Sequence, residues 1–423
     1  MFLPARTSNN YRWIIAIIFF TGLMASDVLW FVLSPLLTVI MADLNLGLSQ
    51  GGLSMSIVCL FVALFAIAGG FLVDRMGVKK SYLFGLLFMA IGALGTWQVF
   101  SYGGLFITRV LIGIGFGLCI PIGGVIIMTW FPENERPYMN TINAILPYIA
   151  TVITFSFTVP MYQALGNSWR MVIVLWGLLL VVVAVAWIIW GKDRCPDNMI
   201  TTDEHCPETE VKENPLVTVW KSREVRLLSI AETCDMWSFQ FLSSMLPTYY
   251  IVEVGMSMSA GSRLTAIFPI AGIIAGLVCG VWMTRVGLRR PFMWPMHVMI
   301  FVGTLLAING VGWVRIAGVA MAGFGNAGWA PALFTMPMEF KNMTPSRVGA
   351  VYAIMMSMGF MAAFVSPWLG GWLAERISIH HTIFIFSFSS LIAATCTFLM
   401  KETGPAARVT NIEGSVMQWK NTN

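Results

Sequence analysis

Residues 69–80 read GGFLVDRMGVKK, and residues 279–290 read CGVWMTRVGLRR, so a short charged loop recurs 210 positions later in the chain. In both copies an apolar run ends at polar or charged residues, turns at a glycine (Gly77 or Gly287) and leaves on two basic residues. Further positions align at the same offset, namely Gly113, Gly115 and Pro121 with Gly323, Gly325 and Pro331. This register predicts an internal repeat of two like halves.

The composition is that of a membrane protein. Of the 423 residues, 57% are hydrophobic and 11% are charged, whereas soluble domains carry about a quarter charged residues. The apolar residues come in blocks of about 20, the length needed to cross roughly 30 Å of hydrocarbon. We therefore expect an all-α membrane protein with twelve transmembrane helices, arranged as two pseudo-symmetric six-helix bundles.

Twelve apolar segments mark the expected spans. They run over 13–39, 51–73, 81–101, 103–130, 138–161, 170–190, 226–252, 262–283, 291–309, 312–338, 348–370 and 380–400. The predicted domains are an N-terminal bundle, a cytoplasmic linker, a C-terminal bundle and a cytoplasmic tail, at 1–190, 191–225, 226–401 and 402–423. The linker is rich in acids and prolines. Its Cys195, His205 and Cys206 fit no common zinc spacing, so no metal or cofactor is expected.

Basic residues set the expected orientation. With both termini in the cytoplasm, every lysine and all but five of the 25 basic residues fall on the cytoplasmic side. The positive-inside rule selects this topology. We expect a multi-pass protein of the plasma (inner) membrane, with the lipid bilayer as its surroundings and no nucleic acid as partner.

Three motifs carry a family resemblance. GGFLVDRMGVKK resembles the signature loop of the major facilitator superfamily, and RVLIGIGFGLCIP (109–121) resembles the fourth-span motif of that family. WFPENER (130–136) is similar to the loop that follows it in many solute symporters. The resemblance covers the whole chain and comes nearest to small-anion porters of the organic-anion, nitrate or cyanate type. It implies secondary active transport by alternating access, in a monomer that is not an enzyme.

The same resemblance implies a latch between the two halves. The implied gate residues are Gly70, Asp74, Arg75, Gly77, Glu135 and Arg136. A carboxylate at Asp74 can meet the positive N-terminal end of a helix in the other half, which begins near Arg347. Each such contact contributes about 1–3 kcal/mol, weak enough to break in every cycle. In the second copy Thr284 stands where the acid would be.

Three acids lie inside predicted spans, where ionisable residues cost about 2.5–3.5 kcal/mol and are functional candidates. Asp27 lies in the first span, and Glu232 and Asp235 lie three residues apart on one face of the seventh. The resemblance implies that both spans line a central cavity. Burial and mutual repulsion disfavour the charged form, which suits groups that take up and release a proton. The alternative is an acid bonded to a nearby backbone or amide group, with a structural role only.

Polar and aromatic side chains in the spans are candidates for solute binding. Arg263 opens the eighth span, where a guanidinium can grip a carboxylate with two hydrogen bonds. Arg109, in the fourth span, either binds the anion, pairs with an acid such as Asp27, or extends to the membrane surface. The other substrate candidates are Asn143, Asn326, Trp30, Trp237 and Tyr352. We assign His297, in the ninth span, to packing.

These features favour proton-coupled symport of a small organic anion. The fifth span, NTINAILPYIATVITFSFTVP, has no glycine, whereas drug:proton antiporters of the superfamily carry a glycine-rich run there. Drug or metabolite efflux by proton antiport is the first alternative, and a facilitated carrier for a neutral or cationic solute is the second. A receptor without transport activity is disfavoured by the charged loop and the acids in the spans. No phosphate-binding G-x-x-x-x-G-K-[ST] loop occurs, so this chain does not itself use ATP.

Overall fold

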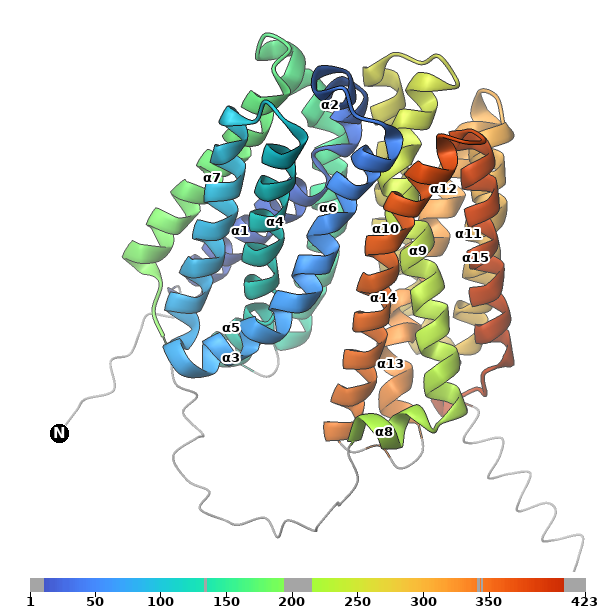
Figure 1. Ribbon diagram of the computed structural model, residues 1–423. Helices are drawn as coiled ribbons and strands as arrows, with labels where there is room; N and C mark the ends of the chain where they lie inside the picture. Colours follow the sequence, from blue (N-terminus) through green and yellow to red (C-terminus); the bar gives the residue numbers. More distant parts are fainter. Residues whose placement is uncertain (1–10, 133–134, 194–214, 341–342, 344, 407–423) are drawn as a thin grey trace, which may run out of the picture. The chain divides into compact units, whose positions relative to one another are not determined.

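The structure is a computed structural model that describes residues 11–132, 135–193, 215–340, 343 and 345–406. Its regular secondary structure in these ranges is helical. The chain divides into two compact units, Met1–Thr209 and Glu210–Asn423, and each unit is treated by itself below. Figure 1 shows the helices of each unit and their labels.

Unit 1 is a helical bundle whose helices are bent or broken at proline and glycine. Its α-helices are α1 (Tyr11–Phe31), α2 (Leu37–Leu44), α3 (Leu48–Gly95), α4 (Tyr102–Cys119), α5 (Ile122–Trp130), α6 (Arg136–Ala164) and α7 (Trp169–Trp190). Two short 3-10 helices, η1 (Ser34–Leu36) and η2 (Thr96–Gln98), follow α1 and α3. The predicted first span is α1, η1 and α2 in succession, because Pro35 has no N–H to continue the hydrogen-bond ladder of α1. Pro121 separates α4 from α5 in the same way.

The charged loop lies within α3. The residues of α3 form one helical run except at Gly77, which has φ 80° and ψ 168° and separates the predicted spans 51–73 and 81–101. Only glycine adopts this conformation without strain. A β-carbon at Gly77 would also lie 3.0 Å from both carboxylate oxygens of Asp193. The motif glycine is therefore required both by its backbone angles and by the space around it.

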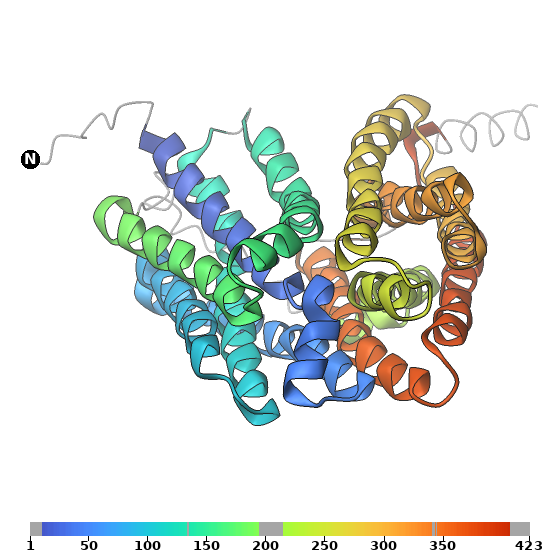
Figure 2. The same ribbon diagram turned by 90° about the horizontal axis from the view of Figure 1, so that it is seen from above.

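Unit 2 repeats this design. Its α-helices are α8 (Pro215–Trp220), α9 (Arg223–Val252), α10 (Met258–Val286), α11 (Trp294–Asn309), α12 (Trp313–Gly328), α13 (Ala330–Glu339), α14 (Pro345–Ala374) and α15 (Ile379–Leu399), with the 3-10 helix η3 (Arg290–Phe292). Helix α9 packs between α14 and α15 (Figure 1; Figure 2). The break between α12 and α13 precedes Pro331, the repeat partner of Pro121.

Ten helical segments in the described ranges are long and apolar enough to cross a membrane. The remaining two predicted spans, the seventh and the tenth, correspond to α9 and to the α12–α13 pair. Helix α9 is less apolar because it carries Glu232 and Asp235 in addition to charges in its first turn. The α12–α13 pair is interrupted at Trp329. The span predictions thus hold as helices, and the two exceptions are those with polar or broken interiors.

Close helix packing in unit 1 depends on the glycine ladder of α4. A β-carbon at Gly113 would lie 3.0 Å from the carbonyl oxygen of Val58, and one at Gly117 would lie 2.9 Å from that of Val62. Both carbonyls belong to α3. Glycines four apart therefore let α4 and α3 approach backbone to backbone, as the spacing predicts.

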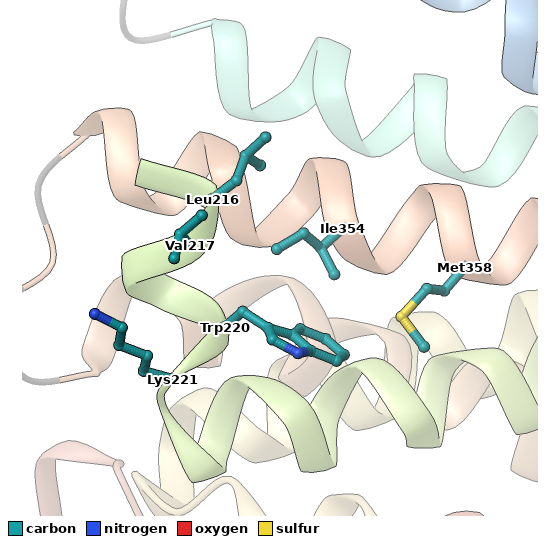
Figure 3. Close-up of a pocket in the computed structure, with 6 residues that line it drawn as sticks. All are labelled: Leu216, Val217, Trp220, Lys221, Ile354 and Met358. Atoms are coloured by element: carbon teal, nitrogen blue, oxygen red, sulfur yellow. The ribbon is translucent and has the colours of Figure 1, made fainter. Parts of the chain in front are cut away.

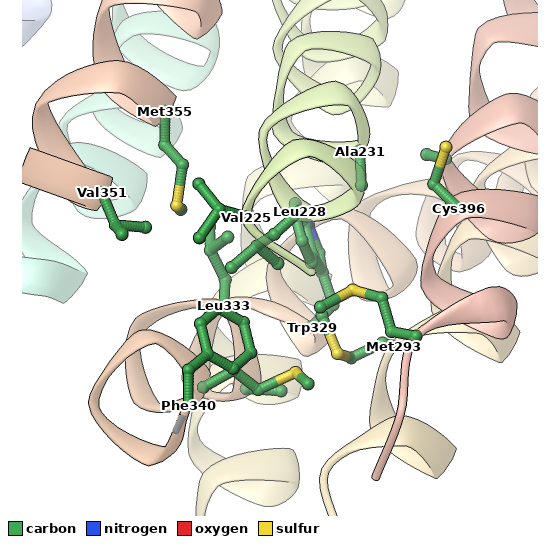
Figure 4. Packing of buried hydrophobic residues seen from close by; sticks show 14 of the residues in the cluster. Val225, Leu228, Ala231, Met293, Trp329, Leu333, Phe340, Val351, Met355 and Cys396 are labelled. Atoms are coloured by element: carbon green, nitrogen blue, oxygen red, sulfur yellow. The ribbon is translucent and has the colours of Figure 1, made fainter. Parts of the chain in front are cut away.

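A buried apolar cluster forms the core of unit 2. Trp329 is 1% exposed and packs with Leu228 of α9, Met293 before α11, and Leu333 of α13 (Figure 4). The cluster also includes residues of α14 and α15, such as Met355. Close packing of side chains is what holds helices together inside a membrane, so this cluster fixes α9 and Trp329 in place.

The repeat extends to polar contacts at the helix ends. Asp43, in the last turn of α2, accepts hydrogen bonds from Nε1 of Trp169 at 3.1 Å and Nη2 of Arg170 at 2.7 Å. Glu253, 210 positions later, accepts one from the N–H of Ile379 at 2.5 Å, and Ile379 is itself 210 positions after Trp169. In each unit an acid at the end of one helix therefore binds the start of the last helix.

The structure differs from the predicted linker and tail at their edges. Helix α8 and the first residues of α9 lie inside the predicted linker 191–225. Leu216, Val217 and Trp220 of α8 face Ile354 and Met358 of α14 across an open apolar pocket of about 430 Å³ (Figure 3). This apolar face explains why part of the predicted linker is helical. Cys195, His205 and Cys206 lie outside the described residues.

Candidate functional site

The candidate site in unit 2 is centred on Asp235, in the first half of α9. Nδ2 of Asn326, on α12, donates a hydrogen bond to Oδ2 of Asp235 at 3.0 Å. Asp235 is 2% exposed and Asn326 is 4% exposed. The indole of Trp329 lies within reach of the same carboxylate. The structure thus joins two residues that the sequence placed in different roles, one in proton coupling and one in solute binding.

Glu232 lies one turn before Asp235 on the same face of α9. It is 2% exposed, and its Oε2 has no hydrogen-bond partner among the described residues. A β-carbon on Gly359 of α14 would lie 3.5 Å from Oε1, so the carboxyl faces the helix neighbouring α9. Glu232 is also close enough to Asp235 for their negative charges to repel each other. Two buried acids with few partners make this face of α9 the candidate functional site of unit 2.

His297 belongs to this group of residues, although the sequence assigned it to packing. It lies on α11, is 0% exposed, and its Nδ1 is 3.8 Å from Oδ1 of Asp235. Its ring also packs on Trp329, with 4.5 Å between the ring centroids. The sequence showed only a single histidine in the apolar span 291–309. It did not show which helix the ring faces.

In unit 1 the corresponding buried acid is Asp27 of α1. It is 3% exposed, and its Oδ2 makes no hydrogen bond within the part of the chain that the structure describes. Asp27 is the unit 1 residue that most resembles Asp235 in position and burial.

Arg109 does not pair with Asp27. Its guanidinium donates to the carbonyl oxygens of Leu29 at 2.6 Å, Trp30 at 2.7 Å and Ser54 at 3.2 Å, and the residue is 1% exposed. Leu29 and Trp30 lie in the last turn of α1, whose carbonyls lack helical partners and accept bonds from Arg109 instead. The third carbonyl, of Ser54, belongs to α3. The expected Arg109–Asp27 pair is therefore replaced by a link between α4, α1 and α3.

The remaining solute candidates make other contacts, each within its own unit. Arg263 is exposed and its Nε donates to the carbonyl of Ser259, one turn earlier in α10, at 3.2 Å. The hydroxyl of Tyr352 donates to the carbonyl of Phe334. Trp30 stacks on Phe31, and the ring centroids of Trp237 and Phe386 are 4.9 Å apart. Oδ1 of Asn143 is buried and has no hydrogen-bond partner in the described ranges.

The charged loop is held by acids that follow the last helix of each unit. Oδ1 of Asp193 accepts a hydrogen bond from the N–H of Lys79 at 2.7 Å. Glu402 accepts from the N–H groups of Arg289 and Arg290 at 2.8 Å and 2.9 Å. The start of the predicted tail is therefore fixed to the second loop, while residues 407–423 lie outside the described chain.

Two other gate candidates, Glu135 and Arg136, make contacts within unit 1. Glu135 forms an ion pair with Arg12 at 2.9 Å, and Arg136 donates to the carbonyls of Phe131 and Met128 at 3.1 Å and 3.0 Å. Arg75 is exposed. A β-carbon at Gly70 would meet no atom within 4 Å. The side chain of Asp74 lies outside what the structure describes.

Comparison with known proteins gives a family and several relatives. The Major Facilitator Superfamily model matches residues 18–261 and 228–421. A probable galactarate/D-glucarate transporter of Bacillus subtilis (strain 168) is 24% identical, over 96% of this chain and 95% of the relative. A probable sulfoacetate transporter of Cupriavidus necator is also 24% identical, over 82% of this chain and 84% of the relative. The hexuronate transporter of B. subtilis is 26% identical over 56% of each chain.

A solved structure supports the fold. The inward-facing, unoccupied crystal structure of a bacterial homologue of the human lysosomal transporter Spinster has a TM-score of 0.78 with this chain, at 15% identity, covering 93% of this chain and 97% of that one. Together with the family match, this confirms the predicted fold class, an all-α membrane protein of the major facilitator fold. The relatives are transporters of small solutes and not enzymes. The chain belongs to the Major Facilitator Superfamily and is a multi-pass membrane transporter.

Proposed function

We propose that this transporter imports a small organic anion together with protons, by alternating access, as a monomer in the plasma membrane with both termini in the cytoplasm. The relatives named above are a probable galactarate/D-glucarate transporter, a hexuronate transporter and a probable sulfoacetate transporter, and all of these solutes carry a carboxylate. Entry of such an anion into a negatively charged cytoplasm is opposed by the membrane potential, by about 2.3 kcal/mol per charge per 100 mV. Protons carried with the anion offset this cost.

One observation carries the proton-coupling proposal. Each of the three buried acids, Asp27, Glu232 and Asp235, keeps a carboxyl oxygen without a hydrogen bond among the described residues. Buried polar groups with a purely structural role are nearly always hydrogen-bonded. A carboxyl that binds a proton during transport instead needs an oxygen atom that remains available. We assign Asp235 the main role, since Asn326 holds its other oxygen in place.

For the solute we favour Arg263 over Arg109 as the anion partner. The guanidinium of Arg109 already donates to three backbone carbonyls. Among the described residues Arg263 makes one hydrogen bond, through Nε to its own helix, so its two terminal nitrogens can bind a carboxylate. We also propose Asn143 and Asn326 as polar contacts to the solute, with Trp30, Trp237 and Tyr352 as apolar contacts.

For the conformational change we propose that the charged loop of α3 is the latch. Asp74 and Arg75 would contact the other half, while Glu135 and Arg136 stabilise the neighbouring turn. The loop itself is already fixed to unit 1 by Asp193, so a contact to the other half can form and break without unfolding it.

The proposal is tested with purified protein in liposomes. Labelled D-glucarate, a hexuronate and sulfoacetate are supplied outside, with an inwardly directed proton gradient, and internal label is measured with and without an uncoupler. We expect the labelled solute to accumulate inside above its external concentration, and we expect the uncoupler to abolish this accumulation. Equilibration without accumulation would identify a facilitated carrier, and proton-driven loss of internal solute would identify an antiporter; either result would contradict the proposal.

A further inference from the structure

His297 is a buried imidazole with both nitrogens unsatisfied. It is 0% exposed, and neither Nδ1 nor Nε2 has a hydrogen-bond partner among the described residues. Leaving a buried polar group unpaired costs about 1–3 kcal/mol. A histidine used only to fill space would be replaced at lower cost by an apolar side chain. We therefore expect the imidazole of His297 to form a hydrogen bond with a neighbouring group in some state of the protein.

That partner is Asp235. Its Oδ1 also lacks a hydrogen bond and lies 3.8 Å from Nδ1 of His297, which is about 1 Å beyond ordinary hydrogen-bond distance. The other titratable groups near this carboxyl are Glu232 and Cys234 on α9, with Cys396 of α15 next to Cys234. His297 is the only one of these neighbours that can carry a positive charge.

The surrounding residues hold the two groups in this arrangement. Asn326 donates to the far oxygen of Asp235 at 3.0 Å, which turns Oδ1 toward α11. Trp329 packs against the imidazole at 4.5 Å between ring centroids and is itself fixed in the core cluster of unit 2. A small shift of the ring is then enough to close the gap to Oδ1.

We infer that Asp235 and His297 form a two-residue site that binds one proton between the carboxyl and the imidazole. Without the proton the pair has a net charge of −1. The proton comes from hydronium, whose O–H bond breaks to leave water. It forms one new bond, either O–H on Oδ1 or N–H on Nδ1 of a ring that carries its other hydrogen on Nε2, and the pair becomes neutral. The shared proton draws the ring and the carboxyl into a hydrogen bond. Its use in solute uptake rests on the proposed function, whereas the binding of the proton does not.

The first test needs no solute. The ring nitrogens of the four histidines are labelled, and their NMR signals are followed with pH in protein held in lipid nanodiscs. Loss of a signal in the His297→Gln variant assigns His297. We expect the His297 signal to respond to pH and to lose that response in Asp235→Asn, because the amide cannot exchange a proton. A matched control is Thr304→Val, which removes another buried, unpartnered polar atom from α11 and is expected to leave the signal unchanged.

Either of two results overturns the inference: a His297 signal that does not respond to pH in the unmodified protein, or the same response in Asp235→Asn as in the unmodified protein. The first is measured in the unmodified protein and needs the His297→Gln variant only to assign the signal.

The second test concerns transport of labelled D-glucarate. His297→Gln keeps a hydrogen-bonding side chain of similar size but cannot take up a proton. We expect proton-driven accumulation to fall at least tenfold, while exchange of internal for external solute stays within about twofold of wild type. A loss of both activities would indicate a merely structural residue, and normal accumulation would refute proton sharing. If the unmodified protein itself shows no proton dependence, the proposed function fails, and the NMR result still decides the proton site.

Discussion

The carboxylate of Asp193 accepts a hydrogen bond from the backbone N–H of Lys79 at 2.7 Å. The same contact recurs in unit 2, where Glu402 binds the N–H of Arg289 at 2.8 Å. Lys79 and Arg289 are 210 positions apart, the offset of the sequence repeat. The repeat thus preserves the acid that closes each charged loop, in addition to the loop itself.

Replacing Asp193 in unit 1 or Glu402 in unit 2 by the corresponding amide is expected to destabilise that unit. Glu402 also accepts hydrogen bonds from Arg290, Thr403 and Gly404, so Glu402→Gln should cost more than Asp193→Asn. A hydrogen bond to a charged acceptor contributes at most about 1.5–3 kcal/mol to the free energy of unfolding. Thermal unfolding of the purified protein measures the effect, with Lys80→Gln, an exposed change within the loop, as control. A Glu402→Gln protein that unfolds at the temperature of wild type would refute this role.

Gly77→Ala tests the conformation of the first loop. Gly77 has φ 80°, and an added β-carbon would lie 3.0 Å from the Asp193 carboxylate. Strain of this kind costs about 1–3 kcal/mol. Gly124→Ala is the matched control, because a β-carbon there meets no atom within 4 Å. We expect a lower unfolding temperature for Gly77→Ala only, and equal behaviour of the two variants would show that the loop tolerates a side chain.

The two arginines should separate stability from solute binding. Arg109→Met leaves the carbonyls of Leu29, Trp30 and Ser54 without their donor, so we expect poor expression or a large loss of thermal stability. Arg263→Ala removes an exposed side chain with one local hydrogen bond. We expect this variant to fold normally, with an apparent KM for D-glucarate raised about tenfold, the effect of roughly 1.4 kcal/mol of lost binding. An unchanged KM would exclude Arg263 from the solute site.

Asp74→Asn tests the latch. The variant keeps the size of the side chain but loses its charge, so attraction to a helix N-terminus in the other half is weakened. We expect normal expression, with both uptake and exchange of solute reduced about tenfold because both need the conformational change. Glu135→Gln should have the smaller effect, since Glu135 pairs with Arg12 inside unit 1. Wild-type rates in Asp74→Asn would refute the latch.

Much of the fold could be predicted from the sequence because the patterns that indicate it lie within short stretches of the chain. The copied loop indicated the repeat, and the apolar blocks indicated the helices. The pair of acids Asp43 and Glu253, separated by the repeat offset of 210, also lay in the sequence, but their role was visible only once their partners Trp169 and Ile379 were placed beside them.

The site was harder to predict because it depends on how helices are rotated against each other. The spacing of Glu232 and Asp235 correctly predicted one face of α9. Nothing in the sequence showed that this face meets Asn326 and His297 from two other helices. Likewise, the partners of Arg109 follow from the end of α1, which the apolar pattern of residues 13–39 concealed.

The most direct measurement of the central claim compares wild type and Asp235→Asn in the same liposomes. Uptake of labelled D-glucarate under an inward proton gradient is measured next to exchange of internal for external solute. The account predicts that Asp235→Asn keeps exchange but no longer accumulates solute, and that an uncoupler has no further effect on it. Uncoupler-sensitive accumulation by Asp235→Asn at the wild-type level would contradict the account, because the buried carboxyl would then have no part in driving transport.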